Sequence, residues 1–299
     1  GTTVFSPTSL ITGATTGTTG GIGKSGPGAL VLAGTNTSGK LVLTGGSTVL
    51  DYSSENANRL PVSTNNTSAL TLGGVDLQLK GGSYAQELGT NSGTALVAGH
   101  SRIRRTDGGT STIALGPISR ATSSGGAIDF ESGVASTTTA TANGILGGVG
   151  YATVDQADWA VGGGAITALT AYDSFTALGT DKNVLVTASE TVAGTMIGTL
   201  KIAPDAPGQS RTLSSGTLTV YRSGLLFTGP HDFTIAGGSI KCRDGYQYDL
   251  IVHQHGSGVL TLASQYANGS SSALVKAGDG TLVLANTNNT HSGVNFLLG

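Results

Sequence analysis

The amino-acid sequence predicts an all-β protein, a β-solenoid in which short strands alternate with Gly-, Asn- and Thr-rich turns. Glycine provides 49 of the 299 residues, well above the usual share of ~7%. Charged residues make up only 11% of the chain, although exposed helix faces are normally rich in Lys and Glu. Aliphatic residues recur at positions i and i+2, which only a β-strand places on one face. Short strands separated by turns indicate a sandwich or a solenoid.

Composition also limits the class of protein. Hydrophobic residues make up 37% of the chain and the net charge is −2, whereas disordered chains combine few apolar residues with high charge. The weak charge gives no basic face for nucleic acid, and no run of 18 apolar residues predicts a membrane-spanning helix. The single cysteine, Cys242, excludes an internal disulfide and a multi-cysteine zinc site. We expect no cofactor and no metal.

The first segment, residues 1–23, is rich in Thr and Gly, with short apolar runs at Val4-Phe5 and Leu10-Ile11. We interpret it as a capping strand or a strand-swapping arm, and a flexible terminus is the alternative. The chain opens with Gly1 rather than with Met and a leader, which suggests a processed or excised piece.

Residues 24–130 show the clearest alternation and predict solenoid coils, each coil being one turn of the chain around the solenoid axis. Their apolar i, i+2 pairs are Leu30/Leu32, Leu41/Leu43, Leu70/Leu72 and Leu77/Leu79. Glycines stand between and after these pairs and mark the turns. The uneven spacing is compatible with coils of roughly 20 residues that each carry several short strands.

The only basic cluster lies in this region, at Ser101-Arg102-Ile103-Arg104-Arg105. Strand geometry places Arg102 and Arg104 on one face, with Ile103 and Arg105 on the other. We interpret this as a solvated outer face with an inward isoleucine. The alternative is a contact for an anion or an acidic glycan.

Residues 131–198 break the rhythm and predict irregular or inserted coils. Glycines at 144, 147, 148 and 150 allow tight backbone turns before Trp159, the only tryptophan. Such a large ring can seal one end of a core, and stacking against a sugar is the alternative.

Residues 199–299 return to the pattern and predict further coils. Their pairs are Leu200/Ile202, Leu218/Val220, Phe233/Ile235, Leu250/Val252, Leu260/Leu262 and Leu282/Leu284. No coil can bury its own apolar face, but stacking hides that face against the next coil. The chain stops at Leu297-Leu298-Gly299, part-way into what we expect to be another coil.

Two of these segments resemble a known family. Residues 24–32 and 276–293 are similar to the autotransporter-associated β-strand repeat, also called the passenger-associated transport repeat, whose pattern is Lys-x-Gly-x-Gly-Thr-Leu-x-Leu followed by Asn-Thr and a Gly-rich turn. The second copy departs from it at His291-Ser292-Gly293, and the first at Pro27 and Ala29. Residues 143–160 and 69–82 are also similar to segments of large repeat proteins from environmental bacteria. The resemblance implies a right-handed parallel β-helix that is secreted or displayed on a bacterial surface.

No residue pattern indicates a catalytic site. His253-Gln254-His255 places two imidazoles on one strand face, and Asp249 or Asp232 could complete a metal site, but we interpret the pair as outward polar positions. A glycosidase needs two carboxylates, for which Asp129 with Glu131, or Asp155 with Asp158, are the candidates. No Gly-x-Ser-x-Gly elbow and no tandem calcium-binding repeat is present.

We therefore predict a non-catalytic, extracellular structural protein whose solenoid ends pair head to tail into a fibre, sheath or matrix. The alternative is a cell-surface adhesin or glycan-binding passenger, with possible contacts at Arg102, Arg104, Trp159, Tyr246 and Tyr248. A polysaccharide-degrading β-helix enzyme is the third hypothesis. The expected partner is a second copy of the chain, or else surface glycans.

Overall fold

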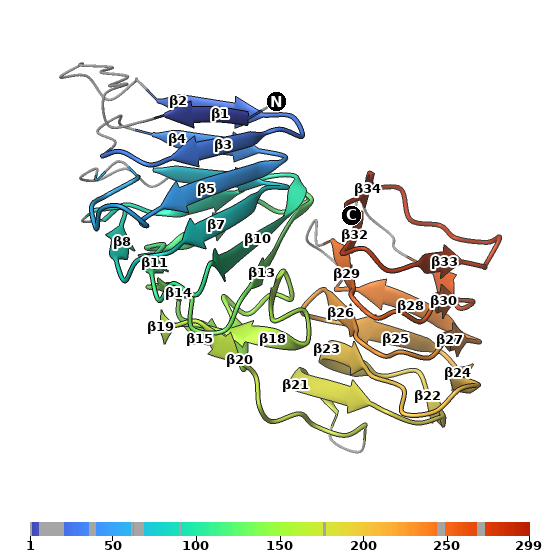
Figure 1. Cartoon of the computed structure of the whole chain (residues 1–299). Helices are drawn as coiled ribbons and strands as arrows, with labels where there is room; N and C mark the ends of the chain where they lie inside the picture. The colour runs from blue at the N-terminus through green and yellow to red at the C-terminus, as the bar shows by residue number, and fades with distance from the viewer. Residues whose placement is uncertain are drawn as a thin grey trace. The chain divides into compact units, whose positions relative to one another are not determined.

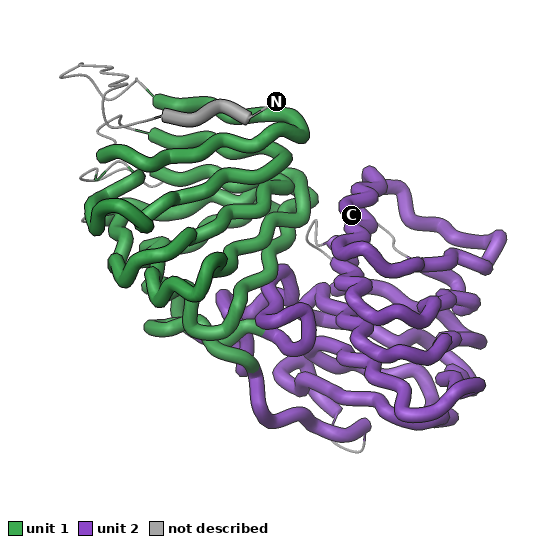
Figure 2. Tube along the Cα trace, in the orientation of Figure 1, with its two compact units in different colours: residues 1–140, 160–168 green, residues 141–159, 169–299 purple. Residues whose placement is uncertain are grey.

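A computed structural model describes most of the chain: residues 2–5, 21–35, 40–60, 62, 69–89, 91–175, 178–243, 249–267 and 273–299. The described residues contain strands and turns and no helix. The chain divides into two compact units (Figure 2). Unit 1 comprises residues 1–140 and 160–168, and unit 2 comprises residues 141–159 and 169–299.

Unit 1 is a stack of coils whose strands form three sheets (Figure 1). The first sheet contains, in spatial order, β1 (Thr2–Phe5), β3 (Ala29–Leu32), β5 (Ser47–Asp51), β7 (Asp76–Lys80), β10 (Gly99–Thr106) and β13 (Gly126–Phe130). The second contains β2 (Ile22–Ser25), β4 (Leu41–Thr44), β6 (Leu70–Gly73), β9 (Thr94–Leu96) and β12 (Ile118–Arg120). The third contains β8 (Ala85–Glu87), β11 (Thr112–Ala114), β14 (Ala135–Thr137) and the short β19 (Gly164–Ala165).

Parallel register aligns the apolar residues of successive coils in unit 1. Leu30 pairs with Thr48, Thr48 with Leu77, and Leu77 with Ile103. All eight leucines of the predicted pairs between residues 30 and 79 are buried. Each coil therefore hides its inward face against the next one, and the prediction of an all-β parallel β-helix with short strands is confirmed.

Antiparallel pairing interrupts the solenoid between residues 135 and 168. In unit 1, β14 pairs with β19, and the Ala160-Val161 end of β18 (Asp158–Val161) pairs with β20 (Thr167–Ala168). In unit 2, β15 (Thr141–Ala142) pairs with β16 (Ile145–Leu146), and β17 (Ala152–Val154) pairs with β18. These strands lie within residues 131–198, where the sequence predicts irregular or inserted coils. Later in that range, however, β21 (Gly179–Val186) and β22 (Glu190–Ala193) pair in parallel with the next coil.

Unit 2 is a second stack of coils, again formed by parallel strands. One sheet contains β21 (Gly179–Val186), β23 (Met196–Ile202), β25 (Thr217–Val220), β26 (Gly224–Phe227), β28 (Ser239–Cys242), β29 (Leu250–Gln254), β31 (Gln265–Tyr266), β32 (Leu274–Ala277) and β34 (Asn295–Leu297). The other contains, in spatial order, β22 (Glu190–Ala193), β24 (Gln209–Ser215), β27 (Phe233–Ala236), β30 (Leu260–Leu262) and β33 (Leu282–Leu284).

The unit 2 core confirms five of the six predicted pairs and corrects the last. Both residues of every pair from Leu200/Ile202 to Leu260/Leu262 are buried. In the last pair, Leu282 is half-buried and Leu284 is 38% exposed. Leu284 sits in register with the buried Leu262, but no described strand lies on the other side of β33. Sequence alternation gives the side on which a residue points, whereas its burial also needs a covering neighbour.

The first and last segments of the predicted organisation are only partly described. Residues 2–5 form β1, which pairs with β3 at the edge of the first sheet. The remainder of the predicted arm up to residue 20 lies outside the described residues.

Candidate functional site

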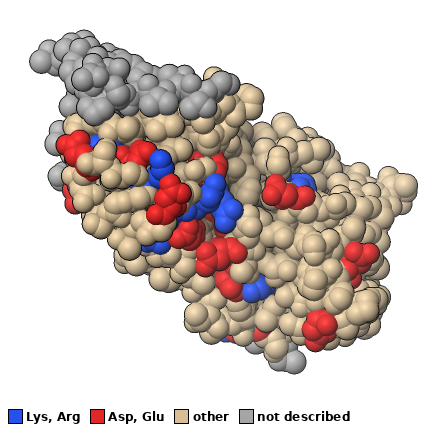
Figure 3. All heavy atoms as spheres, viewed as in Figure 1, with Lys and Arg blue, Asp and Glu red and all other residues tan. Residues whose placement is uncertain are grey.

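Charged side chains of both signs gather on one face of unit 1, over the first sheet (Figure 3). This charged strand face consists of Asp51, Asp76, Lys80, Arg102, Arg104 and Asp129, with the Arg105–Glu131 pair at its margin. Its members come from β5, β7, β10 and β13 and the residue after β13, and each cation pairs with a carboxylate on a neighbouring coil. The sheet register produces these pairs, because parallel stacking brings residues from different coils side by side.

The best-defined pair joins Arg104 and Asp76. The Nε and Nη2 atoms of Arg104 donate to the two carboxylate oxygens of Asp76 at 2.9 and 2.8 Å. This two-pronged geometry is the strong form of the Arg–carboxylate bond, and the hydrogen bond to Asp76 raises the pKa of Arg104. Two residues earlier on the same face of β10, Nε of Arg102 lies 3.4 Å from a carboxylate oxygen of the buried Asp129.

These pairs bear on the predicted anion contact. Arg102 and Arg104 are both partly exposed, with 40% and 32% of their side chains accessible. Each nevertheless faces an acid of this chain, so an anionic ligand would have to compete with Asp129 or Asp76. The charged strand face is accordingly a ladder of neutralised pairs, and the glycan or anion contact there stays a prediction.

Trp159 does not seal an end of the core, as the sequence predicts for a large ring. It packs with Leu226, which lies between the core residues Leu225 and Phe227 of β26 and therefore faces the outer side of the sheet. Its side chain is fully buried in unit 2 and packs in a cluster with Ile145 and Leu226. A buried indole offers no ring face to a sugar, so the alternative of Trp159 as a stacking platform is wrong for this structure. The remaining two candidates, Tyr246 and Tyr248, lie outside the described residues.

His253 corrects another prediction. The sequence predicts outward polar positions for the histidines of His253-Gln254-His255, yet His253 is fully buried. Its Nε2 donates to the backbone oxygen of Gly150 at 3.1 Å, and its ring meets the Trp159 ring edge-on at 5.5 Å. The hairpin that carries Trp159 covers this outer face of the sheet, which turns a polar surface position into a buried one.

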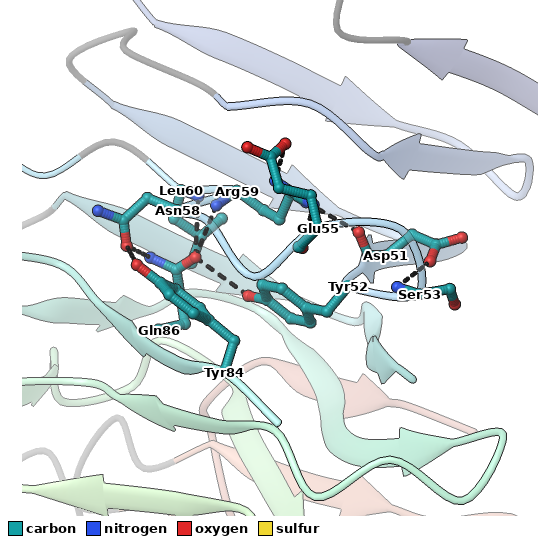
Figure 4. A network of polar contacts seen from close by, with 9 residues as sticks. All are labelled: Asp51, Tyr52, Ser53, Glu55, Asn58, Arg59, Leu60, Tyr84 and Gln86. Atoms are coloured by element: carbon teal, nitrogen blue, oxygen red, sulfur yellow. Dashed lines mark hydrogen bonds and ion pairs between the residues drawn. The ribbon is translucent and has the colours of Figure 1, made fainter. Parts of the chain in front are cut away.

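A network of polar groups lies inside unit 1, at the loop after β5 (Figure 4). The Oε1 atom of Gln86 accepts hydrogen bonds from the Tyr52 hydroxyl at 3.0 Å and from the backbone N–H groups of Arg59 and Leu60 at 2.7 and 3.2 Å. Arg59 donates to the backbone oxygens of Asp51 and Glu55 at 2.8 and 2.6 Å. Because buried polar groups are costly when unpaired, this network fixes the loop onto the coil below it.

The carboxylates considered for glycoside hydrolysis are engaged in other contacts. Asp129 faces Arg102, and Glu131 pairs with Nη1 of Arg105 at 3.1 Å. Asp158 accepts a hydrogen bond from the Tyr172 hydroxyl at 2.9 Å and pairs with Lys201. These contacts fasten neighbouring segments to one another.

The two end coils of unit 2 differ in how they are covered. At β24, the fully buried Arg211 stacks on the Phe175 ring and its Nη1 donates to Glu190 on β22 at 2.9 Å. At the other end, β33 and β34 each pair with a single described strand. The last coil exposes Val283, Leu284, Val294 and Leu297, and Leu297 is 75% accessible. We call these four residues the open apolar coil.

Comparison with known proteins gives no relative for this chain. It matches no protein-family model, no curated protein and no solved structure. The similarity to the autotransporter-associated repeat therefore stays a prediction. Among the described residues, no helix has the length and apolar character needed to span a bilayer.

Proposed function

We propose that this chain is a non-catalytic structural module that assembles outside the cell, joining copies of itself through the open ends of its β-sheets. The open apolar coil is the observation that carries this proposal. Among the described residues, seven large hydrophobic side chains are exposed, and four of them belong to this one coil. Exposed apolar residues scattered singly are normal, whereas a cluster of them marks an interaction surface.

The strand edges add directional bonding to this apolar surface. The outer edges of β33 and β34 have no strand partner in the described structure, and such edges template pairing with another chain. At the opposite end of the chain, β1 and β2 likewise have one strand partner each among the described residues. Pairing of the β33–β34 edge of one copy with the β1–β2 edge of the next is a head-to-tail contact, which forms a filament when it does not close.

Composition supports the extracellular part of the proposal. The chain has a single cysteine, few charges and abundant Thr, Ser, Asn and Gly, which suit a durable, neutral surface layer. The family resemblance points in the same direction. A second copy of the chain is the proposed partner.

Substitution in the open apolar coil tests the assembly. We expect purified protein to form particles in electron micrographs that lengthen with concentration, and the double variant Leu284→Lys, Leu297→Lys to remain dispersed. Met196→Lys is the matched control, since Met196 is an exposed hydrophobic residue of unit 2 outside the coil, 42% accessible. Dispersed wild-type particles at every concentration, or equal loss of assembly with Met196→Lys, would contradict the proposal.

A further inference from the structure

A groove with a volume of about 730 Å³ lies on the outside of unit 1, across the third sheet. It lies within the range of ~300–1,000 Å³ that is typical of small-molecule sites. Three successive coils contribute to it, through the ends of β8, β11 and β14 and the turns that follow them. Its described lining is Glu87, Leu88, Gly89, Asn91, Ser92, Ala114, Gly116, Pro117, Ser136, Thr137, Thr138 and Gly164.

Strand register explains why the surface is hollow there. Ala114 on β11 pairs with Glu87 on one side and Ser136 on the other. The intervening residues Gln86, Ile113 and Ala135 point inward and are buried, so Glu87, Ala114 and Ser136 share the outer face. The short side chains of Ala114 and Ser136 thus stand beside the longer side chain of Glu87. Because they are short, they leave space above the floor of the groove.

The turns on the far side of the groove are held close to one another. Gly116 has a φ of +60°, and a Cβ atom there would lie 1.8 Å from the backbone oxygen of Ser92. The Gly116 carbonyl in turn accepts hydrogen bonds from the Thr137 hydroxyl at 2.6 Å and the Thr138 N–H at 3.2 Å. These two bonds tie the turns after β11 and β14 together, and the turn with Ser92 packs closely against Gly116. This wall of the groove is therefore preformed, which lowers the entropic cost of binding.

The charge of the lining selects the class of ligand. Glu87 is exposed, no described residue forms an ion pair with its carboxylate, and neither Lys nor Arg is among the described lining residues. An anionic ligand would meet only a negative charge here. Ser136 and Thr138 add hydroxyl groups, whereas Ala114, the glycines and Pro117 add apolar surface. A carboxylate and hydroxyls beside a flat apolar floor match a ligand with many hydroxyl groups and a hydrophobic ring face.

Strand pairing argues against a peptide as the ligand. A peptide that binds by strand addition needs a free strand edge. Two of the three floor strands are paired on both sides, because β11 lies between β8 and β14 and β14 lies between β11 and β19; only β8, at the end of the sheet, has an edge without a described strand partner. Parallel strands are spaced by about 4.8 Å, so three of them give a groove roughly 10 Å long.

We propose that this groove binds a short neutral saccharide along the solenoid axis, with the Glu87 carboxylate accepting hydrogen bonds from sugar hydroxyls and Ala114 supporting a ring face. The site is separate from the open apolar coil, so it extends the proposed structural function to ligand binding. Assembly can fail its test while saccharide binding succeeds, and the reverse also holds.

Calorimetric titration of the full chain tests the proposal, with maltotriose, cellotriose, mannotriose and chitotriose as neutral probes and trigalacturonic acid and trilysine as charged ones. We expect at least one neutral probe to bind. Glu87→Gln should weaken that binding at least about tenfold, since hydrogen bonds to a charged group contribute ~1.5–3 kcal/mol. Ala114→Tyr should abolish it by filling the floor.

Ala85→Tyr is the matched control. Ala85 is an exposed residue of β8 on the same sheet but outside the groove lining, so the same ring added there should leave the affinity unchanged. Binding of no neutral probe, tighter binding of trigalacturonic acid or trilysine, or undiminished binding in Ala114→Tyr would overturn the proposal. Because Glu87 is exposed, Glu87→Gln remains informative even where Ala114→Tyr does not fold.

Discussion

The two end coils of unit 2 show what a solenoid needs beyond its repeating pattern. Both ends carry strands with inward apolar residues. At one end, Phe175 stacks on the buried Arg211, and Glu190 neutralises the guanidinium. At the other, Leu284 and Leu297 are exposed. At the covered end, Phe175 from outside the strands packs on Arg211 of β24, whereas no described strand covers β33 and β34 at the other end.

A leucine pair in register gives the largest expected difference between a covered coil and the open one. Leu262 and Leu284 are cross-strand partners, but Leu262 is 1% exposed and Leu284 is 38% exposed. Leu262→Ala should lower the free energy of unfolding of unit 2 by about 2–5 kcal/mol. Leu284→Ala should cost less than about 1 kcal/mol when measured on dispersed protein. Urea unfolding followed by circular dichroism measures both, and equal costs would show that the open coil is covered in solution.

The ion pair at the covered end gives the next largest effect. Burial lowers the pKa of Arg211 to about 10, so the guanidinium is still charged at neutral pH and depends on Glu190. Glu190→Ala should destabilise unit 2 because it leaves a buried charge unpaired. The cost should be about 2–3 kcal/mol, below the ~3–5 kcal/mol of a fully buried pair, since the Glu190 side chain is 37% exposed.

A second variant separates charge pairing from packing at this end. Arg211→Met keeps the apolar stem of the side chain and removes the charge. It should be nearly neutral or stabilising, as replacement of buried ion pairs by apolar residues often is. A large loss of stability in Arg211→Met, as in Glu190→Ala, would show that the guanidinium itself is needed to cover the coil.

Alkaline pH should weaken both units through buried tyrosines. Burial raises the pKa of Tyr52 in unit 1 and of Tyr172 in unit 2. Their contribution is complete below the unfolded pKa of ~10 and is lost as the pH rises above it, because the unfolded state releases the proton first. The loss should reach about 1.4 kcal/mol per pH unit for each tyrosine. Urea titrations between pH 9 and 11 should show a shallower decline in Tyr172→Phe than in the wild type.

The smallest effect is expected on the charged strand face. Arg104 and Asp76 are each about one-third exposed, at 32%, so solvent screens their attraction. Arg104→Gln should cost about 0–1 kcal/mol of unfolding free energy in unit 1, and the cost should fall further in 0.5 M NaCl. Asp76→Asn should give a similar value, and a loss above 2 kcal/mol in either variant would mean that the pair is effectively buried.

Much of the fold could be predicted because it depends on local pattern. The pairs from Leu30/Leu32 to Leu260/Leu262 point inward as expected, since alternation fixes the face on which a strand residue lies. The break near residue 140 was visible too, as a loss of that alternation. The division into two units was not predicted. It depends on which segments pack together, and the local sequence pattern does not indicate the packing of distant segments.

The candidate sites were far less predictable. Gln86, Arg59 and Arg211 look like surface residues in the sequence, yet all three are fully buried. His253 and Trp159 meet only because the hairpin that pairs residues 153–154 with 158–159 covers the sheet. No local signal could reveal these contacts, because each joins residues from different coils. A stronger hint was available at the groove, where small residues recur at Ala114, Gly116 and Ser136.

The sequence by itself determined the strands, the turns and the side of each strand that faces inward, because backbone sterics and side-chain alternation act over a few residues. The tertiary structure alone decided which of those faces are covered. Coverage depends on register between coils, on the hairpin that buries Trp159 and on the cap formed by Phe175 and Arg211. The tertiary structure also leaves Leu284 and Leu297 exposed, although the alternation of apolar residues in the last coil is the same as in the coil before it.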